Sequence, residues 1–380
     1  MLKDKDSYKV CSYKECEKWI DTVVDYKEVI VDKQVRELLV NWINEILNNK
    51  KNSLVKSIFN KDINIDEVKL KFINEEDVKV NLEDISVECN VYDIDLIFEG
   101  EMYKKRVFLT NLCYYILFYH YRKNGYGNDE PLFLPASRTG FMLTYKTLIN
   151  ESIKNSFGNE KIQRSKFTAP IINFLNKFVD LNVGINGQYF DIVKFIEKEL
   201  LKGNIVKDES PVKNIYYKPD NLNDTLPLYL TSSLVTEVAP LVLFLSDVNS
   251  DFRTLIIEEP ESHLHLKAQI AMARVVVRLV NSGLNVWLTT HSDTFMQQIN
   301  NLLKLNVHKD KAELLKKLNL EKQDCLDISN VRVYEFNTSE GKTTVTAIKN
   351  SETGFPLPTF NDVISKLTDE VMILEDEEDD

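Results

Sequence analysis

The spacing of apolar positions divides the first two thirds of the chain into four regions. From Lys33 to Leu47 apolar residues recur every three or four positions, which predicts an early helix. From Val68 to Thr110 short β-branched runs alternate with polar turns, which predicts a small antiparallel sheet. The run Pro131 to Leu134 is typical of a short buried strand. From Phe141 to Lys207 helical periodicity dominates, and we expect a helical insertion there.

The final third alternates strand-like and helix-like segments. The runs Thr254 to Ile257 and Asn285 to Leu288 each precede a helical stretch, Val331 to Ile348 is typical of a hairpin, and Phe360 to Leu374 looks helical. Because strand-helix-strand order favours parallel pairing, the predicted fold class is α/β, with a mixed sheet core, an antiparallel N-terminal subdomain and a helical insertion.

Composition limits the kind of protein this is. The chain has 380 residues of which 43% are apolar, enough for a sizeable core. No stretch reaches the roughly 18 to 20 apolar residues of a spanning helix, and the N-terminus lacks the apolar region of a secretory signal, so we expect a cytoplasmic protein without a membrane partner. The five scattered cysteines predict reduced thiols. The net charge of −12 gives no support to DNA binding by the chain as a whole.

The strongest chemical signal is the string Leu255-Ile-Ile-Glu-Glu-Pro-Glu-Ser-His-Leu-His265. An apolar strand ends in two adjacent carboxylates, and Pro260 then turns the chain. Nucleotide hydrolysis needs one acid near Mg²⁺ and one that orients the attacking water. Glu258 is therefore the metal candidate and Glu259 the candidate base. On its own, a pair of acids after a strand is more often a solvated turn than a catalytic site. The segment that follows makes the catalytic site the favoured interpretation.

A second predicted strand, Asn285 to Thr290, ends at His291-Ser292-Asp293. Ligands collect at this end of parallel strands, so His291 is a candidate donor to a γ-phosphate and a sensor of hydrolysis. The simpler alternative is that His291 precedes a helix capped by Ser292 or Asp293. Both interpretations can hold together.

The whole string from Leu255 to Ile299 resembles the Walker B, D-loop and histidine-switch region of SMC-like ABC ATPases. It is most similar to prokaryotic AAA-family ATPases of the OLD (overcoming lysogenization defect) type. The resemblance implies that Glu258 is the Walker B acid, Glu259 the hydrolytic glutamate and His291 the switch histidine. It also implies a D-loop in which Glu261 and His263 contact nucleotide.

Two further segments resemble parts of the same family. Ser232 and Ser233 begin a string that resembles the Ser-Ser-Gly-x-x-Glu signature, with Leu234 in place of glycine. Hydroxyls at a helix N-terminus can bind the partner subunit's γ-phosphate, although a plain helix cap explains them equally well. The string Pro135 to Gly140 resembles a segment that precedes the family's helical insertion, and its Arg138 either contacts a phosphate or pairs with an acid.

The phosphate-binding string Gly-x-x-x-x-Gly-Lys-[Ser/Thr] does not occur in the sequence. The nearest decoy, Gly341-Lys-Thr-Thr344, has Phe336 where the first glycine belongs and is expected to be a hairpin turn. A truncated start, a split ATPase and a degenerate protein each explain this, and the retained acids and histidine favour the first.

The resemblance divides the chain into residues 1–112, part of the first lobe of an ATPase head, 113–225, the insertion, and 226–380, the second half of the core. It implies ATP and Mg²⁺ as cofactors, a homodimer or higher oligomer formed through the heads, and a separate effector protein, commonly a nuclease, in DNA repair or anti-phage defence. The alternatives are a non-catalytic scaffold that binds a partner protein and, less favoured because its signatures are not found, a membrane transporter's nucleotide-binding subunit.

Overall fold

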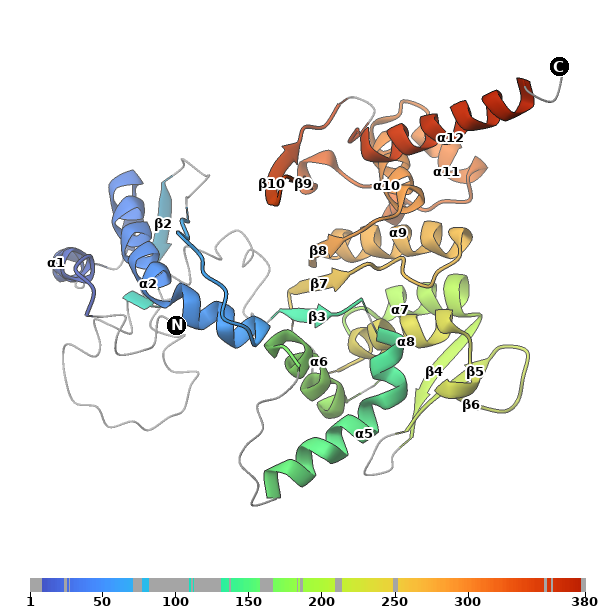
Figure 1. Ribbon diagram of the computed structural model, residues 1–380, viewed down its shortest axis with the longest axis horizontal. Coiled ribbons are helices and arrows are strands. Elements are labelled where there is room, and N and C mark those ends of the chain that lie inside the picture. The colour runs from blue at the N-terminus through green and yellow to red at the C-terminus, as the bar shows by residue number, and fades with distance from the viewer. Residues whose placement is uncertain are drawn as a thin grey trace. The chain divides into compact units, whose positions relative to one another are not determined.

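The computed structural model describes residues 9–23, 26, 28–70, 77–81, 109–110, 112, 131–136, 138–157, 167–182, 184, 187–208, 214–248, 252–351, 354–356 and 358–376. The chain divides into two compact units (Figure 1). The first contains residues 1–126 and 164–170, and the second contains residues 127–163 and 171–380. Each unit is described by itself.

The first unit is built on the long helix α2 (Lys33–Phe59). Asp32 begins this helix by accepting a hydrogen bond from the backbone N–H of Val35 at 2.9 Å. One face of α2, with Trp42 fully buried, packs against α1 (Tyr13–Val23) and a two-stranded antiparallel sheet of β1 (Glu28–Val31) and β2 (Val78–Asn81). The predicted early helix is confirmed, and it extends twelve residues beyond Leu47.

The predicted strand that starts at Val68 is wrong for its described residues. Here the chain runs beside α2, and its backbone hydrogen bonds go to asparagine side chains of that helix. The side chain of Asn48 accepts a hydrogen bond from the Val68 N–H at 3.0 Å and donates one to the Val68 carbonyl at 2.7 Å. The side chain of Asn44 forms the same two hydrogen bonds with the backbone of Leu70. The side-chain amides replace the strand partner that the β-branched pattern suggested. The predicted strand Val91 to Phe98 lies outside the described residues.

The second unit contains a parallel three-stranded sheet in the order β3-β7-β8. Its strands are β3 (Leu132–Leu134), β7 (Thr254–Glu258) and β8 (Asn285–Thr289), and all pair in parallel. The helix α9 (Leu266–Asn281) connects β7 to β8, so the predicted strand-helix-strand unit and its parallel pairing are confirmed.

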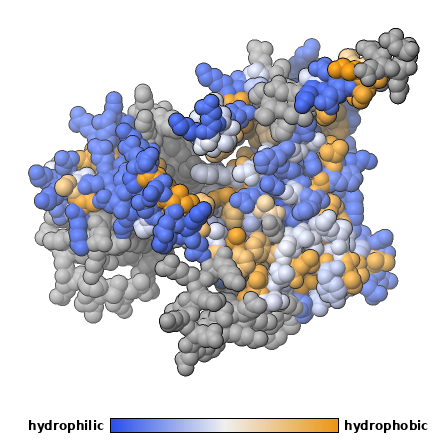
Figure 2. All heavy atoms as spheres, viewed as in Figure 1, coloured by the Kyte–Doolittle hydropathy of each residue, from blue (hydrophilic) through white to orange (hydrophobic). Residues whose placement is uncertain are grey.

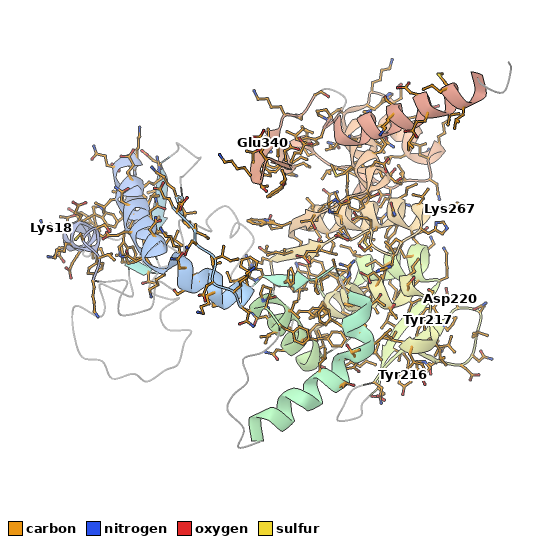
Figure 3. The ribbon with its side chains drawn as sticks, in the orientation of Figure 1. Lys18, Tyr216, Tyr217, Asp220, Lys267 and Glu340 are labelled. Atoms are coloured by element: carbon orange, nitrogen blue, oxygen red, sulfur yellow. The ribbon has the colours of Figure 1, made fainter. Side chains whose placement is uncertain are left out.

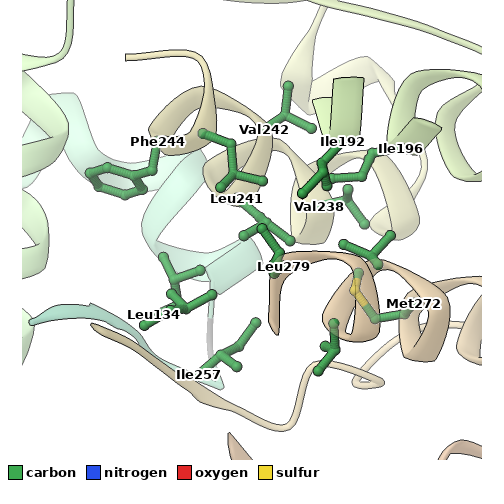
Figure 4. Close-up of a cluster of buried hydrophobic side chains, with 14 of the residues drawn as sticks. Leu134, Ile192, Ile196, Val238, Leu241, Val242, Phe244, Ile257, Met272 and Leu279 are labelled. Carbon is green, nitrogen blue, oxygen red and sulfur yellow. The ribbon is translucent and has the colours of Figure 1, made fainter. Parts of the chain in front are cut away.

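Helices cover this sheet. The helix α8 (Ser233–Leu245) is buried on all sides from Val235 onward and contacts α5 (Arg138–Phe157) and α7 (Phe190–Ile196). Figure 4 shows side chains of α7, α8 and α9 meeting those of β3 and β7 in one apolar core. This core fixes the strand ends because burial of each large apolar side chain contributes about 1.5–3 kcal/mol.

The region from Phe141 to Lys207, predicted to be a helical insertion, is not wholly helical. It includes α5, α6 (Ala169–Asp180), α7 and a short π-helix (Glu197–Leu201), but these are followed by an antiparallel sheet of β4 (Gly203–Lys207), β5 (Ile215–Pro219) and β6 (Leu226–Pro227). Tyr217, labelled in Figure 3, fastens this sheet to the π-helix by donating its hydroxyl to the Leu201 carbonyl at 2.6 Å.

The remaining elements follow β8. They are α10 (Asp293–Val307), α11 (Lys311–Lys317), two 3-10 turns (Lys322–Asp324 and Ile328–Asn330), the hairpin β9 (Val333–Ser339) and β10 (Lys342–Ile348), and α12 (Pro358–Asp376). Gly341 sits at the hairpin turn with φ +75°, so the Gly-Lys decoy is a turn as predicted. Among the described residues, no helix is both long and apolar enough to cross a membrane.

Candidate functional site

The two predicted carboxylates lie where β7 ends. Glu258 is the last residue of β7, and its register partner on β8 is Thr289. The Glu258 side chain accepts a hydrogen bond from the backbone N–H of Ala136, just after β3, at 3.2 Å. The carboxyl ends of all three parallel strands therefore meet around Glu258, at the edge where α/β proteins bind ligands.

Glu259 has a left-handed backbone with φ +43°, which costs a residue with a Cβ about 1–2 kcal/mol. Hydrogen bonds of its N–H, its carbonyl and its carboxylate hold it there. Its N–H donates to the Thr289 carbonyl at 3.0 Å, its carbonyl accepts from the Ser262 N–H at 3.0 Å, and its carboxylate accepts from the Ser262 hydroxyl at 2.6 Å. Backbone strain held in this way is frequent at functional sites, because it aims a side chain that an unstrained turn would place elsewhere.

Arg138, at the start of α5, holds the backbone of both carboxylate-bearing residues. It is 2% exposed, and its guanidinium donates to the carbonyl oxygens of Glu258 at 2.7 Å and Glu259 at 3.0 Å. It also forms an ion pair with Glu237 of α8, with Nη2 and Oε1 2.8 Å apart. Of the two predicted roles, this geometry favours acid pairing over phosphate contact, and the phosphate contact stays a prediction.

Glu237 is also held by the first turn of α5. It is 2% exposed, and its second carboxylate oxygen accepts hydrogen bonds from the N–H of Thr139 at 3.1 Å and the hydroxyl of Thr139 at 2.6 Å. Burial lowers the pKa of the Arg138 guanidinium, and the negative charges of Glu237, Glu261, Glu259 and Glu258 oppose that shift. Four carboxylates thus act on one arginine with opposite charge, and this surplus of negative charge favours a bound cation.

Glu261 connects the loop after β7 to the loop after β8. One oxygen of its buried carboxylate accepts from the hydroxyl of Thr290 and from the backbone N–H of His291, both at 2.7 Å. The other oxygen, Oε2, is buried without a hydrogen-bond partner. The position of His291 is therefore set by a residue two places after Glu259.

His291 itself is exposed and immediately precedes α10. Ser292 caps that helix by accepting from the Phe295 N–H at 3.0 Å, so the predicted cap is confirmed. The hydroxyl of Ser292 also donates to the side chain of Gln269 on α9 at 2.6 Å. The residues around the strand ends, Glu258, Glu259, Glu261, Arg138 and Glu237, are called the strand-end cluster below. His291 thus lies at the edge of this cluster, on a turn that hydrogen bonds to Glu261 and Gln269 hold in place.

Within the described part of the chain, the side chains of the other predicted nucleotide contacts form no hydrogen bond with this cluster. Ser232 and Ser233 are exposed at the N-terminus of α8, and Ser232 makes no side-chain capping bond. They lie one helical turn before Glu237. His263 is exposed with φ +59°. Their roles stay predictions.

Sequence reasoning assigned no site role to Glu237, which it saw only as the last residue of the signature-like string, and none to Thr290. Glu237 had a usable signal, because an acid inside the apolar run from Val235 to Leu245 must be buried and therefore paired. Thr290 had none, since a threonine at the end of a strand is common.

Residues 2–296 match a protein family described as "AAA ATPase domain". The chain belongs to this family. The match includes β3, β7, β8 and every residue of the cluster described above, and it ends within α10. No curated protein gives a significant match to this AAA ATPase domain.

Three solved structures show weak likeness to it. One, from work titled "Structural biochemistry of ATP-driven dimerization and DNA stimulated activation of SMC ATPases", has 12% identity, covers 52% of this chain and 96% of that chain, and gives a TM-score of 0.31. A second is a SmcHead bound to the C-winged helix domain of ScpA, with 13% identity, coverage of 48% and 47%, and a TM-score of 0.28. The third is an Smc head domain with an extended coiled coil, bound to the C-terminal domain of ScpA and derived from Pyrococcus furiosus, with 13% identity, coverage of 62% and 50%, and a TM-score of 0.28.

The donor set of the AAA ATPase domain fits Mg²⁺ bound together with a nucleotide. Mg²⁺ is usually held by one or two carboxylates, with water and phosphate completing its shell. Glu258 and Glu259 supply such carboxylates at the ends of the parallel strands. Among the described residues, no group of three or more His, Cys, Asp and Glu side chains is arranged to hold a metal alone. The phosphates would have to complete the site.

Proposed function

We propose that this AAA ATPase domain is an ATP-driven dimerising switch of a prokaryotic defence or DNA-repair system. In this proposal Glu258 holds Mg²⁺, Glu259 is the catalytic base and His291 senses the γ-phosphate. The resemblance to OLD-type ATPases supports the biological setting, and the strand-end cluster supports the chemistry.

The observation that carries the proposal is the link through Glu261. Its carboxylate ties Thr290 and the His291 N–H to the turn that carries Glu259. A displacement of His291 is therefore transmitted to the residue that would activate water. A switch needs such a connection, because a ligand can shift an equilibrium only by contacts that differ between its two states.

Bound Mg²⁺ would neutralise charge on the transferred phosphoryl group. The residues of this chain contribute the remaining steps. Glu258 orients toward the strand ends because the Ala136 N–H holds its carboxylate. Glu259 accepts a proton from the attacking water at its carboxylate, which the Ser262 hydroxyl keeps in place. Arg138 fixes the backbone of both acids and has its polar contacts within the fold.

The sequence contains no Gly-x-x-x-x-Gly-Lys string, so in this proposal the β- and γ-phosphates are held by residues outside that pattern. The same observation favours a second candidate, a catalytically inactive ATPase-like scaffold that binds a partner effector. A scaffold would keep the Arg138–Glu237 framework without responding to nucleotide.

The two candidates differ in what Glu259→Gln does. Removing the base while keeping the shape of the side chain should stop hydrolysis and hold a closed dimer when Mg²⁺ and ATP are present. Sedimentation velocity would show the dimer in Glu259→Gln but not in Glu313→Gln, a matched change of an exposed acid on α11. If millimolar ATP leaves both variants and the parent chain monomeric, the scaffold is the better account.

A further inference from the structure

The helix α12 presents an apolar stripe to solvent. Every described side chain from Ser365 to Leu374 is exposed, including Leu367 at 56%, Val371 at 52% and Leu374 at 64%. Figure 2 shows apolar side chains on the surface along this helix, near the C-terminal end of the structure. Contiguous exposed apolar residues of this kind mark interaction sites on folded proteins.

The spacing of the stripe is that of a coiled coil. Leu367, Val371 and Leu374 are four and three positions apart, and the sequence continues the alternation backward through Ile364 and Phe360. In heptad terms the β-branched residues fall at position a and the leucines at position d. That combination favours two-stranded pairing. The occupant of the stripe is therefore expected to be a single helix.

The charges beside the stripe decide which helix fits. Between Pro358 and Asp376 the sequence has five acids and one base, Lys366. Glu370 flanks the stripe at heptad position g, and Glu375 falls at the following position e. In a parallel pair of two copies these acids would face each other across the seam, and like charges there oppose pairing. The chain's net charge of −12 adds to that repulsion.

We propose that α12 is a docking helix for a basic amphipathic helix of a partner protein, with which it forms a short two-stranded coiled coil. Lysine or arginine at the partner's e and g positions would pair with Glu370 and Glu375, and apolar residues at its a and d positions would cover the stripe. The helix lies beyond residue 296, where the family match ends, and carries none of the residues of the nucleotide cluster, so this proposal does not rest on the proposed function.

The test uses two synthetic helical peptides as probes on the full chain, followed by fluorescence anisotropy. Both carry Ile at a and Leu at d, one with Lys and the other with Glu at e and g. The Lys peptide should bind saturably and more weakly at high salt, and the Glu peptide should not bind.

Matched variants distinguish peptide binding through the apolar stripe from peptide binding to the acidic surface in general. Leu367→Ser with Leu374→Ser should lower the affinity for the Lys peptide by about tenfold or more, since each leucine loses its buried area in the complex. Met372→Ser with Ile373→Ser removes equally exposed residues, both 60% exposed, from other faces of the helix, and should change affinity by no more than about twofold. Both double variants should keep the parent's melting temperature because the side chains are exposed.

Three results would overturn the proposal. The first is no binding of the Lys peptide, or equal binding of both peptides. The second is an equal loss in the two double variants, which would mean that the peptide binds acidic surface without using the stripe. The third is self-association of the parent chain that Leu367→Ser with Leu374→Ser abolishes, since a second copy would then be the occupant.

Discussion

Replacing Arg138 by methionine removes the cation that holds the strand-end cluster together while keeping most of the side-chain volume. The Glu237 carboxylate would stay buried at 2% exposure without its ion-pair partner, and the carbonyls of Glu258 and Glu259 would lose their donor. Breaking a buried ion pair by removing one partner typically costs about 3–5 kcal/mol. For a unit of this size that corresponds to a fall in melting temperature of roughly 6 to 20 °C.

Hydrogen exchange followed by mass spectrometry can measure this loss in the second unit alone. Peptides from β7 and α8 should exchange faster in Arg138→Met, and a peptide from α2 in the first unit serves as the internal reference. Adding Glu237→Gln to Arg138→Met removes the unpaired charge, so the double variant should be more stable than Arg138→Met. A loss below about 1 kcal/mol in Arg138→Met, or a double variant that shows the sum of both single losses, would refute the reasoning.

Three further predictions concern other parts of the chain. Burial raises the pKa of Asp324, but hydrogen bonds from two arginines of α9 outweigh burial and hold that pKa below its ordinary value of 3.8. The ionised carboxylate therefore stabilises the fold above about pH 4, and this stabilisation is lost as the pH falls through the lowered folded-state pKa. Urea unfolding should show that Asp324→Asn is less stable than the parent at pH 7, and that the difference shrinks in acid. Burial raises the pKa of the Cys16 thiol to about 12, so iodoacetamide at pH 8 should label exposed Cys11 far faster than Cys16 in the native protein, and equal rates would contradict the buried placement. Gly354 has φ +103° and lies against the side chain of Asn300, so Gly354→Ala should lower the unfolding free energy by about 1 kcal/mol or more, and an unchanged urea midpoint would count against it.

The elements that sequence predicted best are those whose pattern is local. The strands β7 and β8, the helix between them and the hairpin at Gly341 each have a periodicity or turn residue that specifies them without help from distant parts of the chain. The sheet of β4, β5 and β6 was missed because its first strand directly follows a segment of strong helical periodicity. The segment at Val68 has a strand-like pattern, but its hydrogen bonds go to Asn44 and Asn48.

In the candidate site, too, local features could be predicted from the sequence and contacts between distant residues could not. Glu258, Glu259 and His291 could be placed at strand ends from the sequence, because an apolar run followed by polar residues marks where a parallel strand stops. The residues that orient them, Arg138 and Glu237, could not be paired from the sequence. Arg138 and Glu237 lie 99 positions apart, and only the packing of α5 against α8 brings them within 2.8 Å.

The most direct test of the nucleotide-switch account is ATP binding that depends on Mg²⁺ and on Glu258. The melting temperature of the parent chain and of Glu258→Gln would be measured with and without Mg²⁺ and ATP. At about 100 times the dissociation constant, a ligand that binds only the folded state adds about 2.7 kcal/mol, or roughly 5 to 11 °C here. The account predicts such a rise for the parent with Mg²⁺ present, and a clearly smaller one for Glu258→Gln. No rise in the parent, or the same rise in the variant, would contradict the assignment of Glu258 and with it the proposed switch.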